Sequence, residues 1–362
     1  MVSKKIITLR NLLYFGYLRV IVISVTLVSL VGLLITGELF SSSTQASSSY
    51  LIASTFMLAT LSLVVVIMST KLTERHPPLF VVSLIGNPHS GKTVYLTVLF
   101  NKFLKSKETF DSYSFYPHGS ETLEYVNENY HKLIERKWLD PTNPLDTFPF
   151  RVVVTSGESL YKRKMEIEIN DYAGEHLISL EKAQWLHKSK YFRNIIASDA
   201  ILFAIDCEDI IKTLISGDKT HCEIIQSNFI MAIDEIMENK GVDRGRRKLE
   251  TPIAFLFMKS DLLIKYEMGI NNIGNDYGVR SNFIGGDDTI APINYENFQY
   301  STEKYATSLF NGLFNHCHKN CKTFNRFFIS STGLLDINGL PPKNLSPKYI
   351  EQPIIWVLNR FI

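Results

Sequence analysis

Eight residues, 86–93, constrain the fold of this chain more than any other feature. They read Gly-Asn-Pro-His-Ser-Gly-Lys-Thr, a full match to the phosphate-loop pattern G-x-x-x-x-G-K-[ST]. The mostly apolar run 81–85 comes directly before them, and the helix-like stretch 94–100 follows directly. In this context the turn points backbone N–H groups at a phosphate, and the helix N-terminus favours its negative charge. The motif therefore predicts an α/β nucleotide-binding fold, in which Lys92 reaches the phosphates and the Thr93 hydroxyl binds Mg²⁺.

The rest of this part of the chain alternates short apolar runs with helix-like stretches. The turn residues 156–159 lie between two apolar runs and predict a hairpin. We therefore expect a mostly parallel sheet with one antiparallel edge hairpin and helices on both faces. Residues 267–300 are rich in Gly, Asn and Asp without periodicity, which predicts a long loop. We expect strands at 80–85, 148–155, 165–169, 200–205, 253–258 and 327–330, and helices at 94–105, 120–138, 224–238 and 353–361.

The first eighty residues have the composition of membrane spans. Residues 20–36 and 50–70 carry no charged side chain, and a serine-rich loop lies between them. Basic residues precede the first span and follow the second, which by the positive-inside rule places both ends in the cytoplasm. We expect an N-terminal membrane anchor at 1–76, with a two-helix transmembrane hairpin of spans at about 17–40 and 50–70. The protein would then cross the membrane twice. In a bacterium this would be the inner membrane. A cleaved signal peptide followed by one anchor is the alternative.

The charge of the chain argues against nucleic acid as its main partner. The net charge is +2, and residues 1–20 contribute four basic side chains without an acid. Residues 21–80 hold two basic and two acidic side chains, so residues 81–362 carry a net charge of −2, and they contain no long basic tract. A nucleic-acid-binding domain usually shows a clustered positive charge.

Four cysteines are too few and too irregularly spaced to predict a disulfide framework. The cluster 316–321 contains two histidines and two cysteines, which raises a zinc site as one hypothesis. The same region carries apolar and cysteine residues at helical spacing, which predicts a helix with one face in the core. We favour core packing for this set: Phe310, Leu313, Phe314, Cys317, Cys321 and Phe324.

A second motif, Asp-Tyr-Ala-Gly-Glu, stands at 171–175, at the end of the apolar run 165–169. A nucleotide hydrolase needs a second carboxylate for Mg²⁺, a sensor of the γ-phosphate and a positioned water. Asp171 can hold Mg²⁺ through its water shell, and the Gly174 N–H can approach the γ-phosphate. Glu175 would then lie close to the attacking water.

The order of these motifs resembles that of Ras-like P-loop GTPases. That family has Lys-x-Asp after one later strand and Ser-Ser-x-Gly after another. This chain has Met-Lys-Ser-Asp at 258–261, Ser-Ser-Thr-Gly at 330–333, and Asp-Pro-Thr at 140–142, where the family keeps its switch threonine. The resemblance covers about 80–362, less the insertions. It looks closest to the membrane-tethered or double-GTPase type of bacterial members, which share the sequence patterns S-G-K-T-x-Y-L and D-x-A-G-E.

The resemblance implies GTP or GDP as the nucleotide and Mg²⁺ as the metal. Thr93 and Thr142 would coordinate Mg²⁺, with Asp171 behind its water shell; Thr147 is the rival of Thr142. The implied catalytic residues are Lys92, Thr142, Gly174 and Glu175. The residues implied around the phosphates are Gly86, Asn87, His89, Ser90, Gly91, Lys92 and Thr93.

The resemblance also implies how the base is read. Lys259 would stack its stem on the base, and Asp261 would accept hydrogen bonds from guanine N1 and N2. Ser331 would present its backbone N–H near guanine O6. Three positions depart from the family pattern: Met258 replaces the usual Asn or Thr, Glu175 stands where many members have Gln, and Pro88 stands where Ras has Gly.

The sequence thus predicts a membrane-anchored GTPase that hydrolyses GTP to GDP and phosphate with Mg²⁺ and acts as a molecular switch at the cytoplasmic membrane face. The P-loop GTPase domain would span 77–362, with insertions at about 106–138 and 265–300. Its partners would be nucleotide, membrane lipid and a membrane-associated protein effector; oligomerisation stays open. The alternatives are a weakly hydrolysing or non-hydrolysing membrane scaffold or receptor subunit, and an ATPase. The Lys259 and Asp261 pair argues against the ATPase.

Overall fold

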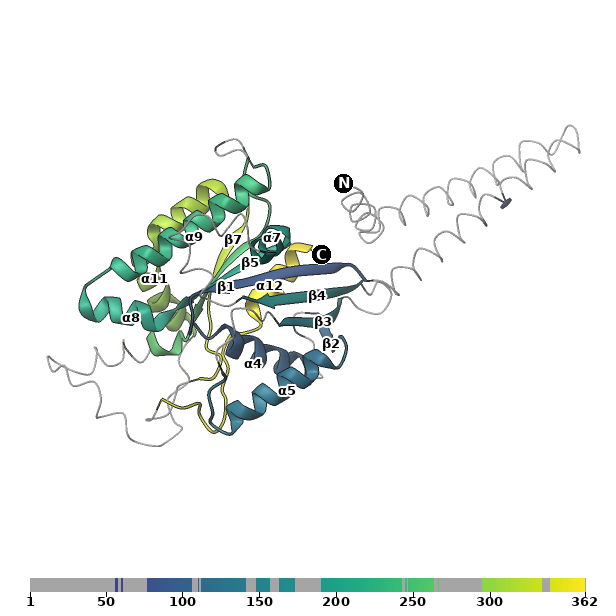
Figure 1. Cartoon of the computed structure of the whole chain (residues 1–362), viewed down its shortest axis with the longest axis horizontal. Coiled ribbons are helices and arrows are strands. Elements are labelled where there is room, and N and C mark those ends of the chain that lie inside the picture. Colours follow the sequence, from purple (N-terminus) through teal and green to yellow (C-terminus); the bar gives the residue numbers. More distant parts are fainter. Residues whose placement is uncertain are drawn as a thin grey trace, which may run out of the picture. The chain divides into compact units, whose positions relative to one another are not determined.

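Seven strands form one sheet in a computed structural model of the chain (Figure 1). Their order across the sheet is β2-β3-β4-β1-β5-β6-β7. The strands β1, β5, β6 and β7 pair in parallel. The bounds are β1 Leu79–Gly86, β2 Tyr113–Pro117, β3 Pro149–Ser156, β4 Arg163–Asp171, β5 Ala200–Asp206, β6 Ile253–Met258 and β7 Phe324–Phe328. The structure describes residues 56–57, 60, 77–105, 110, 112–140, 148–156, 163–172, 190–242, 245, 247–263, 266, 295–333 and 339–361.

The chain divides into two compact units. One contains residues 1–79, 155–166 and 362, and the other contains residues 80–154 and 167–361. The second unit holds every described residue of the site considered below.

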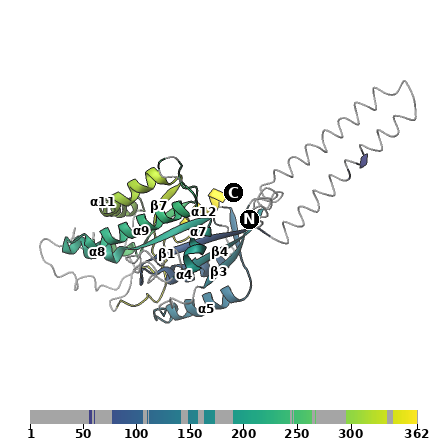
Figure 2. The same cartoon turned by 45° about the horizontal axis from the view of Figure 1, so that its top comes forward.

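The central strands β5 and β6 are apolar apart from Asp206, the last residue of β5. Every residue of β5 and of β6 is buried, which is typical of parallel strands that are covered on both faces. The helices α8, α9 and α11 lie on one side of the sheet, and α4 and α5 lie on the other (Figures 1 and 2). The helix bounds are α4 Lys92–Lys105, α5 Glu121–Ile134, α7 Lys190–Ala197, α8 Cys207–Ser216, α9 Thr220–Asn239, α11 Tyr295–Asn320 and α12 Gln352–Phe361.

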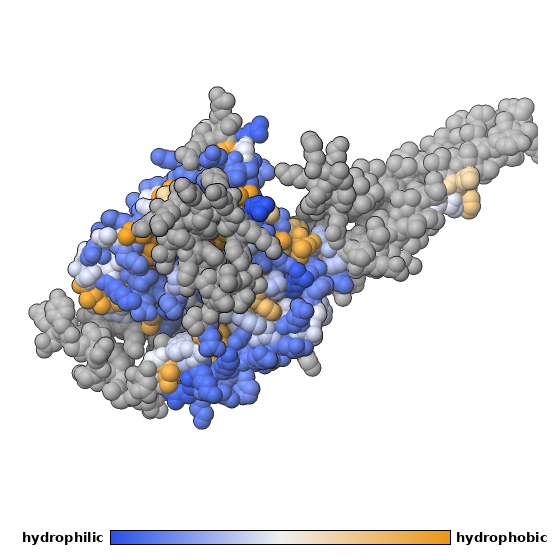
Figure 3. Space-filling view, viewed as in Figure 1, coloured by the Kyte–Doolittle hydropathy of each residue, from blue (hydrophilic) through white to orange (hydrophobic). Residues whose placement is uncertain are grey.

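The surface of the described residues contrasts with this apolar interior. The visible face is largely hydrophilic, with small, separate hydrophobic patches (Figure 3). Ile215 and Ile224 are among the large hydrophobic side chains that stay exposed. Single exposed apolar residues are normal on a folded protein and need no special explanation.

The observed elements agree with the expected ones along most of the described sheet, with several differences. The two strands of the expected hairpin, β3 and β4, are neighbours, but β2 lies outside β3 and takes the edge position. β7 begins at Phe324, so this residue belongs to a strand and not to the helical stripe. Helices α7 and α8 were not expected, although Asp206 caps the N-terminus of α8 and Gly217 ends it with a φ of 74°.

The prediction of a transmembrane hairpin is corrected, and with it the prediction of a two-pass membrane protein. Among the residues that the structure describes, none of the helices combines the length and the apolar character needed to span a bilayer. The predicted spans at 17–40 and 50–70 lie outside the described residues, apart from Phe56, Met57 and Thr60. A charge-free apolar run shows low polarity, but it does not by itself establish a helix of the length that a bilayer requires. The membrane location and the lipid partner inferred from these runs are not supported.

Two cysteines, one near the end of helix α11 and one just after it, lie in the core. Cys317 and Cys321 are buried in the same hydrophobic cluster as Phe310, Leu313 and Phe314. The core-packing interpretation of this stripe is therefore confirmed for these five residues. Within the described part of the chain, no group of three or more metal-binding side chains is found.

Candidate functional site

The loop between β1 and α4 is a tight turn that starts and ends on a glycine. Gly86 ends β1 opposite Ala204 of β5, and a Cβ atom at position 86 would lie 2.7 Å from both the Cβ and the carbonyl oxygen of Ala204. Gly91 has a φ of 85°, a conformation that is costly for residues with a side chain. Helix α4 begins at the next residue, so its N-terminal N–H groups face the loop.

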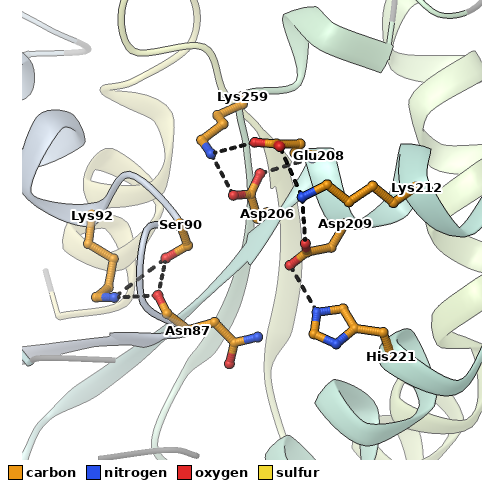
Figure 4. A network of polar contacts seen from close by, with 9 residues as sticks. All are labelled: Asn87, Ser90, Lys92, Asp206, Glu208, Asp209, Lys212, His221 and Lys259. Carbon is orange, nitrogen blue, oxygen red and sulfur yellow. Dashed lines mark hydrogen bonds and ion pairs between the residues drawn. The ribbon is translucent and has the colours of Figure 1, made fainter. Parts of the chain in front are cut away.

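The loop closes around the side chain of Lys92. Its Nζ donates a hydrogen bond to the Gly86 carbonyl oxygen at 2.9 Å. It donates another to the Asn87 carbonyl oxygen, also at 2.9 Å (Figure 4). Ser90 is fully buried, and its hydroxyl donates to the Asn87 carbonyl at 2.8 Å. The ammonium group is thus held at the centre of the turn by backbone atoms. By contrast, His89 is exposed and has a φ of 60°.

The first turn of α4 is joined to the end of β4. The Thr93 hydroxyl donates a hydrogen bond to Oδ2 of Asp171 at 2.7 Å. Asp171 is only 2% exposed. Burial raises the pKa of its carboxyl group, while the Lys92 charge and the Thr93 hydrogen bond act in the opposite direction.

The second oxygen of Asp171 is an unusual feature of this site. Its Oδ1 atom is buried and has no hydrogen-bond partner among the described residues. A buried polar atom without a partner costs free energy, so such atoms are rare in native structures. A hydroxyl group beside a free carboxylate oxygen is a donor set that suits Mg²⁺ with its waters. The residues present therefore fit the metal that the resemblance implies.

At the other end of the site, Lys259 is held by two acidic residues. Its Nζ donates to Oδ2 of Asp206 at 2.6 Å and to Oε2 of Glu208 at 3.3 Å (Figure 4). A Cβ atom at Gly91 would lie 4.0 Å from Lys259 Cε, so the lysine stem passes beside the phosphate loop. Burial would lower the pKa of Lys259, but the charges and hydrogen bonds of the two acids raise it above its ordinary value.

Asp206 and Glu208 were not predicted from the sequence. Two signals could have indicated them: Asp206 directly follows the apolar run 200–205, and it occupies a helix N-cap position. A charged residue at the end of a buried parallel strand lies at the edge where ligands bind in such sheets.

The ends of β6 and β7 bring the other two base-reading candidates together. The Ser260 N–H donates to the Ile329 carbonyl at 3.1 Å, which joins the segment 258–261 to the segment that precedes 330–333. Asp261 is 9% exposed, and Ser331 is half-buried. The turn after Ser331 requires Gly333, whose φ is 82° and where a Cβ atom would lie 2.5 Å from the Ser346 hydroxyl.

The structure does not describe every predicted site residue. Thr142, its rival Thr147, Gly174 and Glu175 lie outside the described residues. The described candidates lie at the ends of β1, β4, β6 and β7 and at the start of α4. These candidates are Gly86, Asn87, His89, Ser90, Gly91, Lys92, Thr93, Asp171, Lys259, Asp261 and Ser331.

Three solved structures are similar to the chain at low identity. The Arl6 BBS3 small GTPase from Trypanosoma brucei, with bound GppNp, is 12% identical with a TM-score of 0.32, over 78% of this chain and 97% of that one. The mammalian SRP receptor is 11% identical with a TM-score of 0.32, over 78% and 100%. A GTP-binding protein from Sulfolobus solfataricus, in complex with GDP, is 12% identical with a TM-score of 0.26, over 77% and 56%. Similarity this distant does not indicate a function for this chain.

A family comparison is more informative. No curated protein matches the chain at a significant level. Residues 83–228, less than half of the chain, match the family model Double-GTPase 1. This range begins in β1 and contains the phosphate loop, Asp171 and the Asp206 cap. The match confirms the predicted resemblance of this chain to Ras-like P-loop GTPases of the double-GTPase type, and with it the prediction of a GTPase.

Proposed function

We propose that this chain binds GTP and GDP with Mg²⁺, hydrolyses GTP to GDP and phosphate, and acts as a nucleotide-dependent switch. The observation that carries the proposal is the arrangement around Asp171. A buried lysine in a glycine turn, a hydroxyl at a helix N-terminus and a carboxylate with one unpartnered oxygen meet there. Each of these groups supplies something that bound triphosphate and its metal require.

Lys92 and the loop backbone would bind the phosphates. The helix N-terminus and the glycine turn offer N–H groups, and the ammonium group offers a fixed positive charge. Lys92 is 6% exposed and already held by the Gly86 and Asn87 carbonyls, so little side-chain freedom remains to be lost on binding.

Thr93 and Asp171 would hold Mg²⁺, the first through its hydroxyl and the second through metal-bound water. The ion would neutralise charge on the phosphate oxygens. Thr142 is proposed as a further ligand. Without the ion, the buried carboxylate is stabilised by the Thr93 hydroxyl and by the nearby charge of Lys92.

Lys259, Asp261 and Ser331 would bind the guanine base. A carboxylate edge selects guanine because adenine offers no matching pair of N–H donors. The buried setting of Asp261 supports this role, since hydrogen bonds to a charged group are stronger away from water.

Gly174 and Glu175 remain the proposed sensor of the γ-phosphate and the residue nearest the attacking water. A glutamate adds negative charge beside the phosphate, so intrinsic turnover should be slow. A protein effector that distinguishes the GTP-bound from the GDP-bound form completes the proposal, with residues 77–362 as the nucleotide domain.

Phosphate release by the purified full chain tests the proposal. We expect Mg²⁺-dependent release from GTP that exceeds release from ATP, and its loss in Lys92→Ala. Lys105→Ala is the matched control, because Lys105 is an exposed lysine in the last turn of the same helix. Equal release from ATP would contradict guanine selection. GTP binding without release would favour the weakly hydrolysing scaffold.

A further inference from the structure

The segment 258–261, which would bind the base, has an apolar side chain at its first position. Met258 ends β6 and is 1% exposed, so an apolar side chain fills a position from which an Asn or Thr could brace the site. In the parallel pairing of β5 with β6, the register partner of Met258 is Asp206. A carboxylate therefore stands on the adjacent strand beside the apolar position.

Both carboxylate oxygens of Asp206 accept a hydrogen bond. Oδ1 accepts a hydrogen bond from the Glu208 N–H at 2.9 Å, which caps helix α8, and Oδ2 accepts from Lys259 at 2.6 Å. The side chain is 8% exposed. Because the cap holds one oxygen, the other is presented to the lysine in a fixed position.

Lys259 needs such a support. Its backbone has a φ of 55°, in the left-handed region that residues with a side chain seldom adopt. Residues in this region persist only where the surroundings hold them in place. The ion pair with Asp206 fixes the far end of the side chain, and the stem lies beside Gly91 of the phosphate loop.

Glu208 contributes less to this support than Asp206 does. Its side chain is 47% exposed, its contact with Lys259 is 3.3 Å, and it is shared with Lys212 (Figure 4). Exposed ion pairs contribute little because water screens them. Breaking a largely buried pair costs more, since one charge is left without a partner.

We infer that Asp206 is a positioning and specificity-determining residue for guanine, acting through Lys259 and supplying the brace that Met258 cannot. This inference rests on the proposed function of the site. It predicts that removing the Asp206 charge lowers affinity for guanine nucleotides and narrows the preference for GTP over ATP.

The test compares two aspartates of the same helix end in the full chain. Asp206→Asn keeps a capping side chain of the same shape but loses the charge that holds Lys259. Asp209→Asn is the matched control, because Asp209 lies in the first turn of α8 and contacts Lys212 and His221 instead. We expect a fall of about tenfold in GTP affinity and a similar loss of GTP preference for Asp206→Asn. We expect a change below about twofold for Asp209→Asn.

A double variant separates positioning from folding. If Asp206 acts through Lys259, Asp206→Asn should change GTP affinity in the wild-type background and not in the Lys259→Met background. Should the single variant fail to fold, the double variant, which removes both charges of the pair, is compared with Lys259→Met alone. A further loss of GTP affinity in that comparison would refute the inference.

The outcomes also separate the inference from the function on which it rests. A wild-type chain without preference for GTP over ATP would refute the proposed function. A wild-type chain with that preference, together with unchanged affinity and preference in Asp206→Asn, would refute the inference alone. Equal losses for GTP and ATP with a lowered Tm would show a merely structural residue and would also refute it.

Discussion

The two ends of the candidate site are built in different ways. The phosphate end is made by one contiguous stretch, in which backbone carbonyls hold Lys92 and the helix starts at once. The base end is made by side chains from the ends of β5, β6 and β7, and Lys259 is held by acids that lie about fifty positions earlier in the chain. Local geometry therefore supports the first end, and the register of the sheet supports the second.

The largest expected effect is at the phosphate end. Lys92→Ala removes the charge that the loop carbonyls hold at the centre of the turn, and we expect the affinity for GDP and ADP to fall by at least about a hundredfold. The loss should be similar for both nucleotides, since this end does not read the base. Titration of a fluorescent GDP analogue measures the effect. Unchanged affinity would overturn the phosphate-loop assignment.

The glycine at the start of the loop should matter for stability. Gly86→Ala places a Cβ atom 2.7 Å from Ala204, and we expect a loss of about 2 kcal/mol in the free energy of unfolding. Ala204→Gly should not rescue it, because the Ala204 carbonyl oxygen is equally close. Urea unfolding of the single and double variants measures both values. Full rescue would show that only the side chains clash.

At the base end the expected effect is selective. Asp261→Asn replaces one acceptor by a donor, and we expect GTP affinity to fall by about tenfold while binding of xanthine nucleotides improves. The comparison is made by competition of GTP and XTP against one fluorescent nucleotide. If GTP affinity is untouched, Lys259 and Asp261 do not read the base.

The smallest expected effect is a gain in stability. Asp171 is a buried carboxylate with one unpartnered oxygen, so Asp171→Asn should raise the stability of the nucleotide-free chain by about 1 kcal/mol, or roughly 2 °C in Tm. The same variant should lose the Mg²⁺ dependence of nucleotide binding. Thermal melts with and without Mg²⁺ and GDP measure both. A lowered Tm without ligand would contradict the view that this carboxylate is kept for a cation.

The phosphate end could be predicted from the sequence because its signal is contiguous. A strand, eight motif residues and a helix start follow one another in the chain, and the observed elements β1 and α4 have nearly the predicted bounds. The Asp171 position could be predicted for the same reason, since one residue separates it from the run 165–169 and it ends the strand. No long-range information was needed for either.

The base end and the sheet edge could not be predicted in the same way. That Asp206 meets Lys259 depends on the pairing of β5 with β6, which the sequence of neither strand reveals. The edge position of β2 depends on a short strand, Tyr113–Pro117, whose alternation is too brief to stand out. The prediction of transmembrane spans was wrong for a different reason, because low polarity was taken as evidence of a spanning helix.

Calorimetric titration of GDP and of ADP into the purified full chain, each with Mg²⁺ and with EDTA, tests guanine selection and the metal site together. We expect GDP to bind more tightly than ADP by at least about tenfold, and GDP binding to weaken in EDTA. ADP binding as tight as GDP binding, or binding that is indifferent to Mg²⁺, would contradict this expectation.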